Sequence, residues 1–299
     1  MLLSGMVEFI RGILEEGLLY AIMAMGVYIT YKILDFPDLS VDGTFPLGAA
    51  VTVVFIIAGV NPVLTLLLSF LTGAAAGAIT GIIHVKFKVR DLLSGIIMMT
   101  ALYSINLRIA GKANVAIFSK DTIFQNAFLD RLVPEFMKDY TVMLILLLIV
   151  VIMKVLLDLY LKTRSGYLLR AVGDNDALVT SLAKDKGIVK IIGLAIANAF
   201  VALSGSIYAQ KSGFFEISSG TGTIVMGLAS VIIGTNIFKR VSFVKATTAV
   251  IIGSIIYKAC VAIAIHYGMA ASDLKLITAV LFLVILVVSN ERKRRVKKA

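Results

Sequence analysis

Residues 140–160 read YTVMLILLLIVVIMKVLLDLY, a run in which Lys154 and Asp158 are the only charged residues. A transmembrane helix needs roughly 20 mostly apolar residues, because the hydrocarbon core of a bilayer is about 30 Å thick. This run meets that requirement by itself. The whole chain agrees with it, since 59% of the 299 residues are hydrophobic and the mean hydropathy is +0.98. Such a composition does not provide a water-soluble surface, so the sequence predicts an integral membrane protein.

Eight further apolar segments lie on either side of this run, some of them short. The nine segments are 17–34, 46–60, 62–83, 91–110, 140–160, 190–209, 222–238, 246–265 and 274–290. They are too long and too uniformly apolar for the alternating strands of an outer-membrane barrel, each about ten residues long. No small-residue cleavage site follows the first segment, so it is interpreted as a retained helix. The predicted fold is all-α, a polytopic membrane helical bundle of about nine spans.

Lysine and arginine in the loops predict the orientation of the bundle. Short cytoplasmic loops are rich in these residues, and they gather at 84–90, at 161–190, at 239–245 and in the basic tail 290–299. The long loop 111–139 is charge-balanced. We therefore expect that loop outside, the C-terminus in the cytoplasm and, by alternation, the N-terminus outside. This topology, with anionic membrane lipid as the partner of the basic loops, explains the net charge of +11, and no nucleic-acid partner is expected.

The segment between the first two spans predicts a broken second helix. Residues 35–46 read DFPDLSVDGTFP, and the apolar run after them, 46–60, is only about 22 Å long at 1.5 Å per residue. Pro37, Gly43 and Pro46 favour irregular backbone. Such backbone survives at membrane depth only where protein or a water-filled cavity covers it.

Two interpretations of this segment stay open, and both can hold. In the first, residues 38–45 border an aqueous translocation path, whose polar side chains are Asp38, Ser40, Asp42 and Thr44. In the second, the polar residues are caps. Asp38 then caps a helix that begins at Leu39, and Thr44 or Phe45 precedes a helix whose first residue is Pro46.

Small residues recur at helical spacing in three spans. They are Gly73, Gly77 and Gly81 in the third, Ala195 and Ala199 in the sixth, and Gly220, Gly222, Gly227 and Gly234 around the seventh. Small faces let helices approach closely in lipid. The pattern predicts a compact bundle, and it is compatible with ordinary packing inside one chain or with a dimer seam.

The loop 161–190 is polar and capable of forming short cytoplasmic helices. Residues 168–172 can make an amphipathic turn that Gly173 ends, and Asp174 or Asn175 can cap a second helix over 176–186 that Gly187 ends. Two short helices of this kind suit insertion into a groove of a cytosolic partner. A pair of helices resting on lipid headgroups is the alternative.

Four short motifs occur in order along the chain: 18–26 (LLYAIMAMG), 38–41 (DLSV), 166–175 (GYLLRAVGDN) and 202–205 (ALSG). Together they resemble the permease subunits of the branched-chain amino acid and ribose type of ABC importer, over about residues 10–260. The resemblance implies that residues 1–299 form one transmembrane permease domain in a bacterial plasma membrane.

The resemblance also implies partners. The loop 166–187 would dock on a cytosolic ATPase through Gly166, Leu168, Leu169, Arg170, Ala171, Gly173, Asp174 and Asn175. The assembly would hold two ATPase subunits, which bind ATP and Mg²⁺, a second permease copy and an external substrate-binding protein. Sugar-type permeases read Asp-Leu-Ser-Val-Gly, whereas Asp42 here precedes Gly43. An amino acid, including an aromatic one, or a similarly small amphipathic solute is therefore expected.

The sequence also indicates that this chain forms the permease and that a different chain hydrolyses ATP. It contains no Gly-x-x-x-x-Gly-Lys-Ser/Thr loop, since Gly111-Lys112 is followed by Ala113, so ATP hydrolysis belongs to another chain. The single cysteine, Cys260, excludes an intrachain disulfide and disfavours a metal cluster. We expect no catalytic residue, metal or cofactor in this chain.

Two other classes of protein are compatible with the apolar composition. An ion-coupled secondary transporter could use Asp38 and Asp42, but it would leave the docking loop unexplained. An intramembrane enzyme would need catalytic groups at one depth, and His84 and His266 fall at opposite faces of the predicted bundle.

Overall fold

The computed structural model describes residues 2–174, 185–239, 241, 243–268, 273, 276, 278–280 and 282–287. In chain order its elements are α1 (Leu2–Val27), a π-helical turn η1 (Tyr28–Ile33), α2 (Val41–Ile57), α3 (Pro62–Lys86), α4 (Asp91–Ala110), β1 (Asn114–Ala116), α5 (Ala127–Leu132), a 3-10 helix η2 (Glu135–Tyr140), α6 (Thr141–Tyr160), α7 (Arg164–Asp174), α9 (Lys186–Ser212), β2 (Phe214–Glu216), η3 (Ile217–Gly220), α10 (Thr223–Ile237) and α11 (Ala246–His266). The predicted polytopic helical bundle is confirmed.

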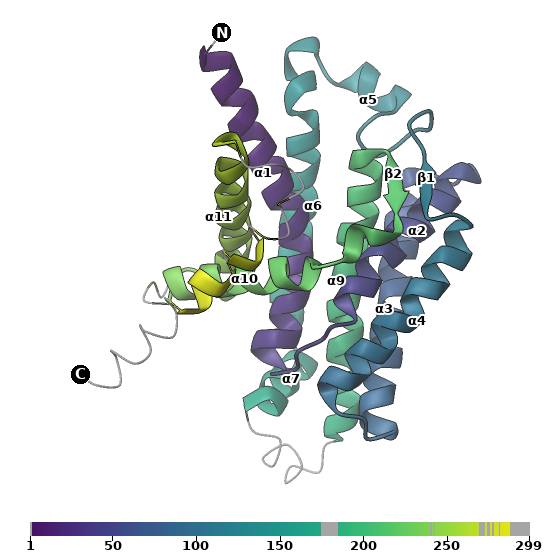
Figure 1. Ribbon diagram of the computed structural model, residues 1–299, viewed down its shortest axis with the longest axis vertical. Helices are drawn as coiled ribbons and strands as arrows, with labels where there is room; N and C mark the ends of the chain where they lie inside the picture. Colours follow the sequence, from purple (N-terminus) through teal and green to yellow (C-terminus); the bar gives the residue numbers. More distant parts are fainter. Residues whose placement is uncertain are drawn as a thin grey trace.

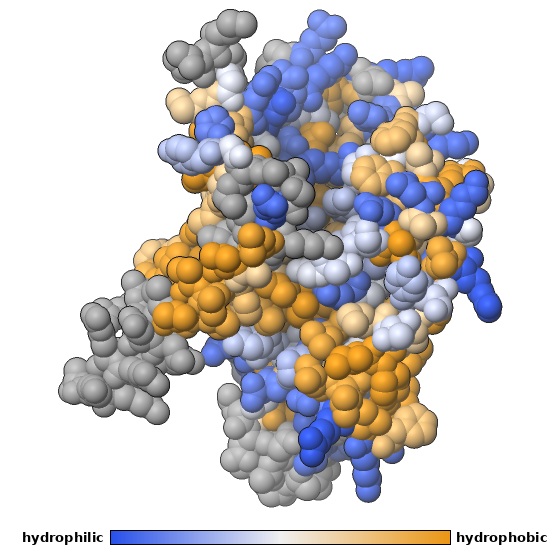
Figure 2. All heavy atoms as spheres, viewed as in Figure 1, coloured by the Kyte–Doolittle hydropathy of each residue, from blue (hydrophilic) through white to orange (hydrophobic). Residues whose placement is uncertain are grey.

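Seven helical segments in the described ranges are long and apolar enough to cross a membrane. They are Gly5–Ile33, Pro62–Lys86, Asp91–Ala110, Met137–Tyr160, Lys186–Ser212, Ile217–Ile237 and Ala246–His266. Two shorter apolar helices, Val41–Ile57 and Thr278–Val287, coincide with the remaining two predicted segments. Figure 2 shows broad hydrophobic areas in the lower half of one face, with hydrophilic residues above and below them.

Helix α1 lies between two groups of helices (Figure 1). On one side α9 packs against α2, α3 and α1, and on the other side α11 packs against α10 and α1. The short antiparallel pair β1 and β2 lies at the upper end in Figure 1, with the loop that carries α5, while α7 and the α3–α4 connection lie at the lower end. The described parts of the two loops 111–139 and 161–190 therefore lie at opposite ends of the bundle, as the sequence predicts.

The glycines of α3 form a seam with α9. A side chain at Gly73 or Gly77 would overlap the backbone carbonyl of Asn198 or Leu194, and one at Gly81 would come within 2.8 Å of the Cα atom of Ile191. Only glycine allows this close approach. For this stripe the interpretation as packing inside one chain is confirmed.

The irregular backbone between the first two spans is shorter than expected. Residues 34–40 are non-helical, but α2 already begins at Val41 and Pro46 lies inside it. The expected helix start at Pro46 is therefore wrong. Pro46 lacks the N–H that would bond the carbonyl oxygen of Asp42, and that oxygen instead faces Gly220, where any side chain would overlap it.

The expected end of the first coupling helix is also wrong. Helix α7 continues through Gly173 to Asp174, because the lack of a side chain at Gly173 lets the helix lie against the carbonyl oxygen of Ile33. Gly187, expected to end a second helix, lies in the first turn of α9, which Asp185 caps. Residues 176–184 of the second helix predicted over 176–186, together with Asn175, Arg240 and the tail 290–299, fall outside the described residues.

Candidate functional site

The first polar centre joins the irregular segment 34–40 to α9. One carboxylate oxygen of Asp38 accepts hydrogen bonds from the backbone N–H of Ser40 at 2.9 Å and from its hydroxyl at 2.6 Å. The other oxygen accepts one from the side-chain amide of Asn198 at 2.7 Å. Asp38 is only 1% exposed. A buried carboxylate is tolerated here because its hydrogen bonds come from the segment itself and from α9.

The second polar centre joins α2 to α10. The backbone N–H groups of Gly222 and Ile224 donate to the two carboxylate oxygens of Asp42 at 2.9 and 2.8 Å, and the hydroxyl of Thr223 donates at 3.0 Å. Helix α10 has no cap of its own, because its N-cap residue is Gly222. Asp42 therefore supplies the missing cap from another helix.

The four predicted path residues lie inside the protein in this conformation. Asp38, Ser40 and Thr44 are buried, and the hydroxyl of Thr44 donates to the carbonyl oxygen of Ser40 at 3.0 Å. Asp42 is partly buried. None of these four residues lines the three cavities described below, so their place on a translocation path stays a prediction.

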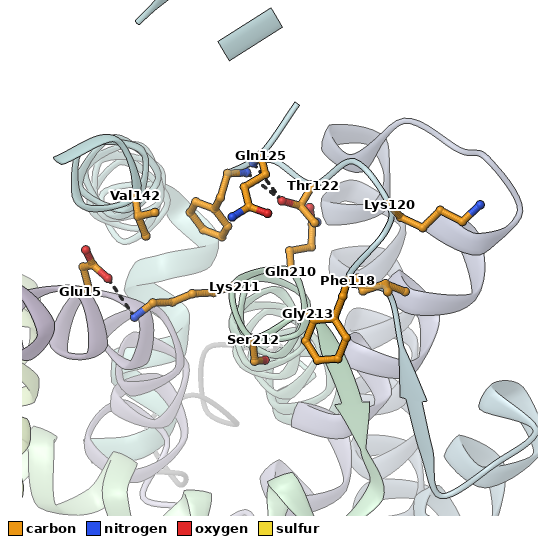
Figure 3. Close-up of a pocket in the computed structure, with 12 residues that line it drawn as sticks. Glu15, Phe118, Lys120, Thr122, Gln125, Val142, Gln210, Lys211, Ser212 and Gly213 are labelled. Atoms are coloured by element: carbon orange, nitrogen blue, oxygen red, sulfur yellow. Dashed lines mark hydrogen bonds and ion pairs between the residues drawn. The ribbon is translucent and has the colours of Figure 1, made fainter. Parts of the chain in front are cut away.

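A cavity of about 250 Å³ lies at the end of the bundle that carries the loop 111–139 (Figure 3). The side chains of Glu15 and Lys211 point toward each other across it, from α1 and α9, with an ion pair of 3.2 Å. The side chain of Gln210 fixes the loop, because its amide oxygen accepts a hydrogen bond from the N–H of Ile123 and its amide nitrogen donates to Thr65.

A second cavity of about 300 Å³ lies between α1, the start of α10, and α11. Its wall includes the rings of Tyr20 and Tyr257, the backbone at Gly222 and the ammonium-bearing side chain of Lys258. The Nζ atom of Lys258 lies 3.8 Å from the centre of the Tyr20 ring, a cation–π contact. Ionisable groups inside membrane bundles face the interior or water-filled cavities and mark functional sites.

Glu16 links these two cavities. It pairs with Lys211 at 3.1 Å and with Lys258 at 3.4 Å. The sequence revealed Lys258 as a rare ionisable residue within a span but not its partner, because the pair joins residues 242 positions apart. Glu15, Glu16 and Lys211 were missed as site residues, although charges within or at the ends of apolar spans were the available signal.

A different ion cluster holds α6 against the start of α11. Asp158 accepts hydrogen bonds from Lys154 at 2.9 Å, Lys245 at 3.1 Å and Thr247 at 2.7 Å. These partners come from the last turns of α6 and from the first residues of α11 and its cap. This cluster, called the Asp158 joint below, connects the end of α6 to the start of α11 and is interpreted as a packing contact.

The lower end of the bundle carries the predicted coupling helix α7 and a basic cavity. Leu169 is fully buried and Gly166 is buried, whereas Tyr167 is 60% exposed and Arg170 is exposed. Leu168 and Ala171 are half-buried. The cavity, of about 550 Å³, is lined by Lys88, Arg90, Lys186 and Lys190 with His84 and Asp185. In the described part of the chain, no group of three or more His, Cys, Asp or Glu residues could hold a metal ion.

The family model described as branched-chain amino acid transport system, permease component, matches residues 9–289. The chain belongs to this family. It is a multi-pass permease subunit of an ABC importer.

Two relatives match the permease along nearly its whole length. The chain is 46% identical to a tyrosine transport system permease protein of Clostridioides difficile (strain R20291), over 96% of the chain and 92% of the relative. It is 33% identical to an uncharacterised protein of Rickettsia prowazekii (strain Madrid E), over 91% of the chain and 94% of the relative. No solved structure matches the permease.

Proposed function

We propose that this permease forms the translocation path of an amino-acid importer and that tyrosine is its first candidate solute. The observation that carries this proposal is the 46% identity to a tyrosine transport system permease protein over 96% of the chain. The two tyrosine rings and the lysine that line the cavity beside α10 suit a small aromatic amino acid.

The ATPase of the complex docks on α7. Its outward residues Tyr167 and Arg170 are available to a partner, while Leu169 and Gly173 fix the opposite face against the bundle. Because Gly173 packs against Ile33 of η1, a displacement of α7 by the ATPase can be transmitted to η1. ATP and Mg²⁺ are bound by that partner, an external protein delivers the solute, and a second permease copy completes the path.

The topology follows from the same assignment. The seven long helices and the two shorter apolar ones make nine crossings, with α2 as a helix that begins inside the bundle. The loop 111–139 and the N-terminus lie outside, and the basic cavity at Lys88 and Lys190 lies in the cytoplasm.

The segment 38–44 borders the translocation path in the interior of the bundle. Figure 1 shows that α2 and α10 begin away from both ends of the bundle, and helices that begin inside a transporter commonly flank its substrate path. Asp42 holds these two helix starts together in the present conformation. Movement of α10 away from α2 would open this segment to solvent.

An ion-coupled secondary transporter is the second candidate, because Glu16 and Lys258 are ionisable groups inside the bundle. The test is to co-express the permease with its chromosomal neighbours and to purify it. An ABC importer co-elutes with an ATPase whose activity rises when a solute-loaded binding protein is added. A permease that elutes alone and transports without any ATPase would support the secondary transporter.

A further inference from the structure

We propose that Glu15, Glu16, Lys211 and Lys258 form a charge track that receives the two charged ends of a zwitterionic solute between the two cavities. This proposal rests on the proposed function, because it takes an amino acid as the solute. It adds the residues that would recognise the solute and the reason why they would favour a zwitterion.

The charges of the track alternate in sign along three helices. Glu15 and Glu16 come from α1, Lys211 comes from the end of α9, and Lys258 comes from α11. Lys211 pairs with Glu15 at 3.2 Å and with Glu16 at 3.1 Å, and Glu16 then pairs with Lys258 at 3.4 Å. The first cavity is lined by Glu15 and Lys211, and the second by Lys258. Glu16 thus connects a lysine of one cavity to a lysine of the other.

The central carboxylate of the track is accessible. The side chain of Glu16 is 40% exposed, whereas those of Lys211 and Lys258 are 20% and 15% exposed. A carboxylate within a membrane-spanning helix is not stable against lipid, so this exposure indicates an aqueous hollow. Glu16 itself lines neither cavity, but it pairs with a lysine of each, so the ammonium group of a solute that passes between the cavities can meet it.

Lys258 can meet the carboxylate of the same solute. An ammonium group has three N–H donors, and among the described residues the one carboxylate in contact with Lys258 is that of Glu16, at 3.4 Å. The Tyr20 ring lies on another side of the ammonium. A second carboxylate can thus bind to Lys258 from the cavity, beside the backbone of Gly222.

Pairing explains why a zwitterion fits the track best. Removing one partner of a buried ion pair leaves an uncompensated charge, which is strongly destabilising. A zwitterion brings one charge of each sign. When Glu16 and Lys258 separate, Glu16 can bind the ammonium group of the solute and Lys258 can bind its carboxylate, so no charge is left unpaired. A solute with only a positive charge, bound to Glu16, would leave Lys258 without its carboxylate partner. A solute with only a negative charge, bound to Lys258, would leave Glu16 paired with Lys211.

The second cavity suits the side chain of an aromatic amino acid. Its volume of about 300 Å³ lies at the lower end of the range for small-molecule sites. Val225, Met226 and Val261 give it an apolar wall, which the buried side chains of Tyr20 and Tyr257 complete. Aromatic rings pack favourably edge to face or with an offset against such rings.

The test uses the complete complex of permease, ATPase and binding protein in proteoliposomes, with labelled tyrosine as the probe. The double variant E16Q/K258Q removes one charge of each sign and leaves the pair of Glu15 and Lys211 intact. We expect uptake to fall at least tenfold while the ATPase subunit co-purifies with the variant in the unmodified amount. Uptake by the double variant within twofold of the unmodified complex would contradict the charge track.

The matched control is Lys154→Gln, which removes one partner of the Asp158 joint and leaves Lys245 and Thr247 in place. We expect uptake within twofold of the unmodified complex. An equal loss of uptake in this control would mean that any missing ion pair impairs the bundle, and would overturn the proposal. If the unmodified complex took up no tyrosine, the proposed function itself would be contradicted.

A second measurement covers the case in which the double variant does not assemble. A cysteine at Val225, in the wall of the second cavity, leaves all four charges in place. In a Cys260→Ser background it should react with a water-soluble thiol reagent, and saturating tyrosine with the loaded binding protein should slow that reaction at least threefold. A cysteine that does not react, or one whose rate tyrosine leaves unchanged, would show that solute does not reach the track.

Discussion

The carboxylate of Asp42, in the first turn of α2, accepts a hydrogen bond of 2.9 Å from the backbone N–H of Gly222, at the start of α10. The two residues are 180 positions apart in the sequence. Gly222 has a φ of 86°, a left-handed conformation that glycine adopts without strain. The contact fixes the starts of two helices against each other, and its loss would separate them.

The first prediction concerns this contact. Asp42→Ala removes the acceptor for three donors at the start of α10, and the loss of a helix cap costs about 1–2 kcal/mol. We expect a lower Tm in detergent and reduced uptake from an assembled complex, with a smaller effect for Asp42→Asn, whose amide oxygen still accepts a hydrogen bond. The control is Asp121→Asn in the exposed loop. An unchanged Tm for Asp42→Ala would show that this cap does not contribute to the stability of the permease.

The second prediction concerns the segment 38–44. Ser40 and Thr44 are fully buried, so cysteines at these positions should be inert to an aqueous thiol reagent in the present conformation. If the segment borders the path, trapping the ATP-bound state should change their labelling rate far more than that of a cysteine at Leu147, which is 45% exposed on the outer face of α6. Cysteines that stay inert in every nucleotide state would leave the segment with a packing role only.

The third prediction concerns the docking helix. A valine at Gly173 would overlap the carbonyl oxygen of Ile33 and lift α7 from the bundle, so we expect less ATPase to co-purify and the Tm to fall. Arg170→Glu should reduce ATPase co-purification without changing the Tm, because Arg170 is exposed. Full co-purification of the ATPase with both variants would remove α7 from the docking surface. Gly12→Ala, a site with open space around it, is the control.

The fourth prediction concerns the seam between α3 and α9. A methyl group at Gly77 would overlap the carbonyl oxygen of Leu194, and overpacking of this kind typically costs about 1–3 kcal/mol. Gly77→Ala should therefore lower the Tm, whereas Gly12→Ala should not. Equal Tm values for the two variants would mean that the helices are not in close contact.

The fifth prediction concerns topology. Lys120 and Lys162 are both exposed; Lys120 belongs to the loop that carries α5 and Lys162 precedes α7, and these two elements lie at opposite ends of the bundle (Figure 1). Cysteines at the two positions should react with an impermeant reagent from the outside and from the inside of the membrane, respectively. Cys260 must be replaced by serine first, because it is exposed on α11. Labelling of both positions from the same side would exclude the proposed orientation.

The apolar helices could be predicted from the sequence because span length and composition are local properties. The start of α2 could not, because it depends on Gly220 and Gly222, which meet Asp42 only in the folded chain. For the same reason the sequence predicts a helix end at Gly173, whose neighbour in the folded chain is Ile33 of η1. The ion pairs of Glu16 with Lys211 and Lys258 join three helices, and no periodicity within one helix indicates such partners.

The proposed function requires that ATP hydrolysis by a partner subunit drives an amino acid through this permease. The most direct measurement is the uptake of labelled tyrosine into proteoliposomes that contain the complete complex, with ATP supplied to the ATPase side and the binding protein on the other. We expect uptake that requires hydrolysable ATP and the binding protein, and that persists when ionophores collapse all ion gradients. Uptake without ATP, driven by an imposed sodium or proton gradient, would contradict it.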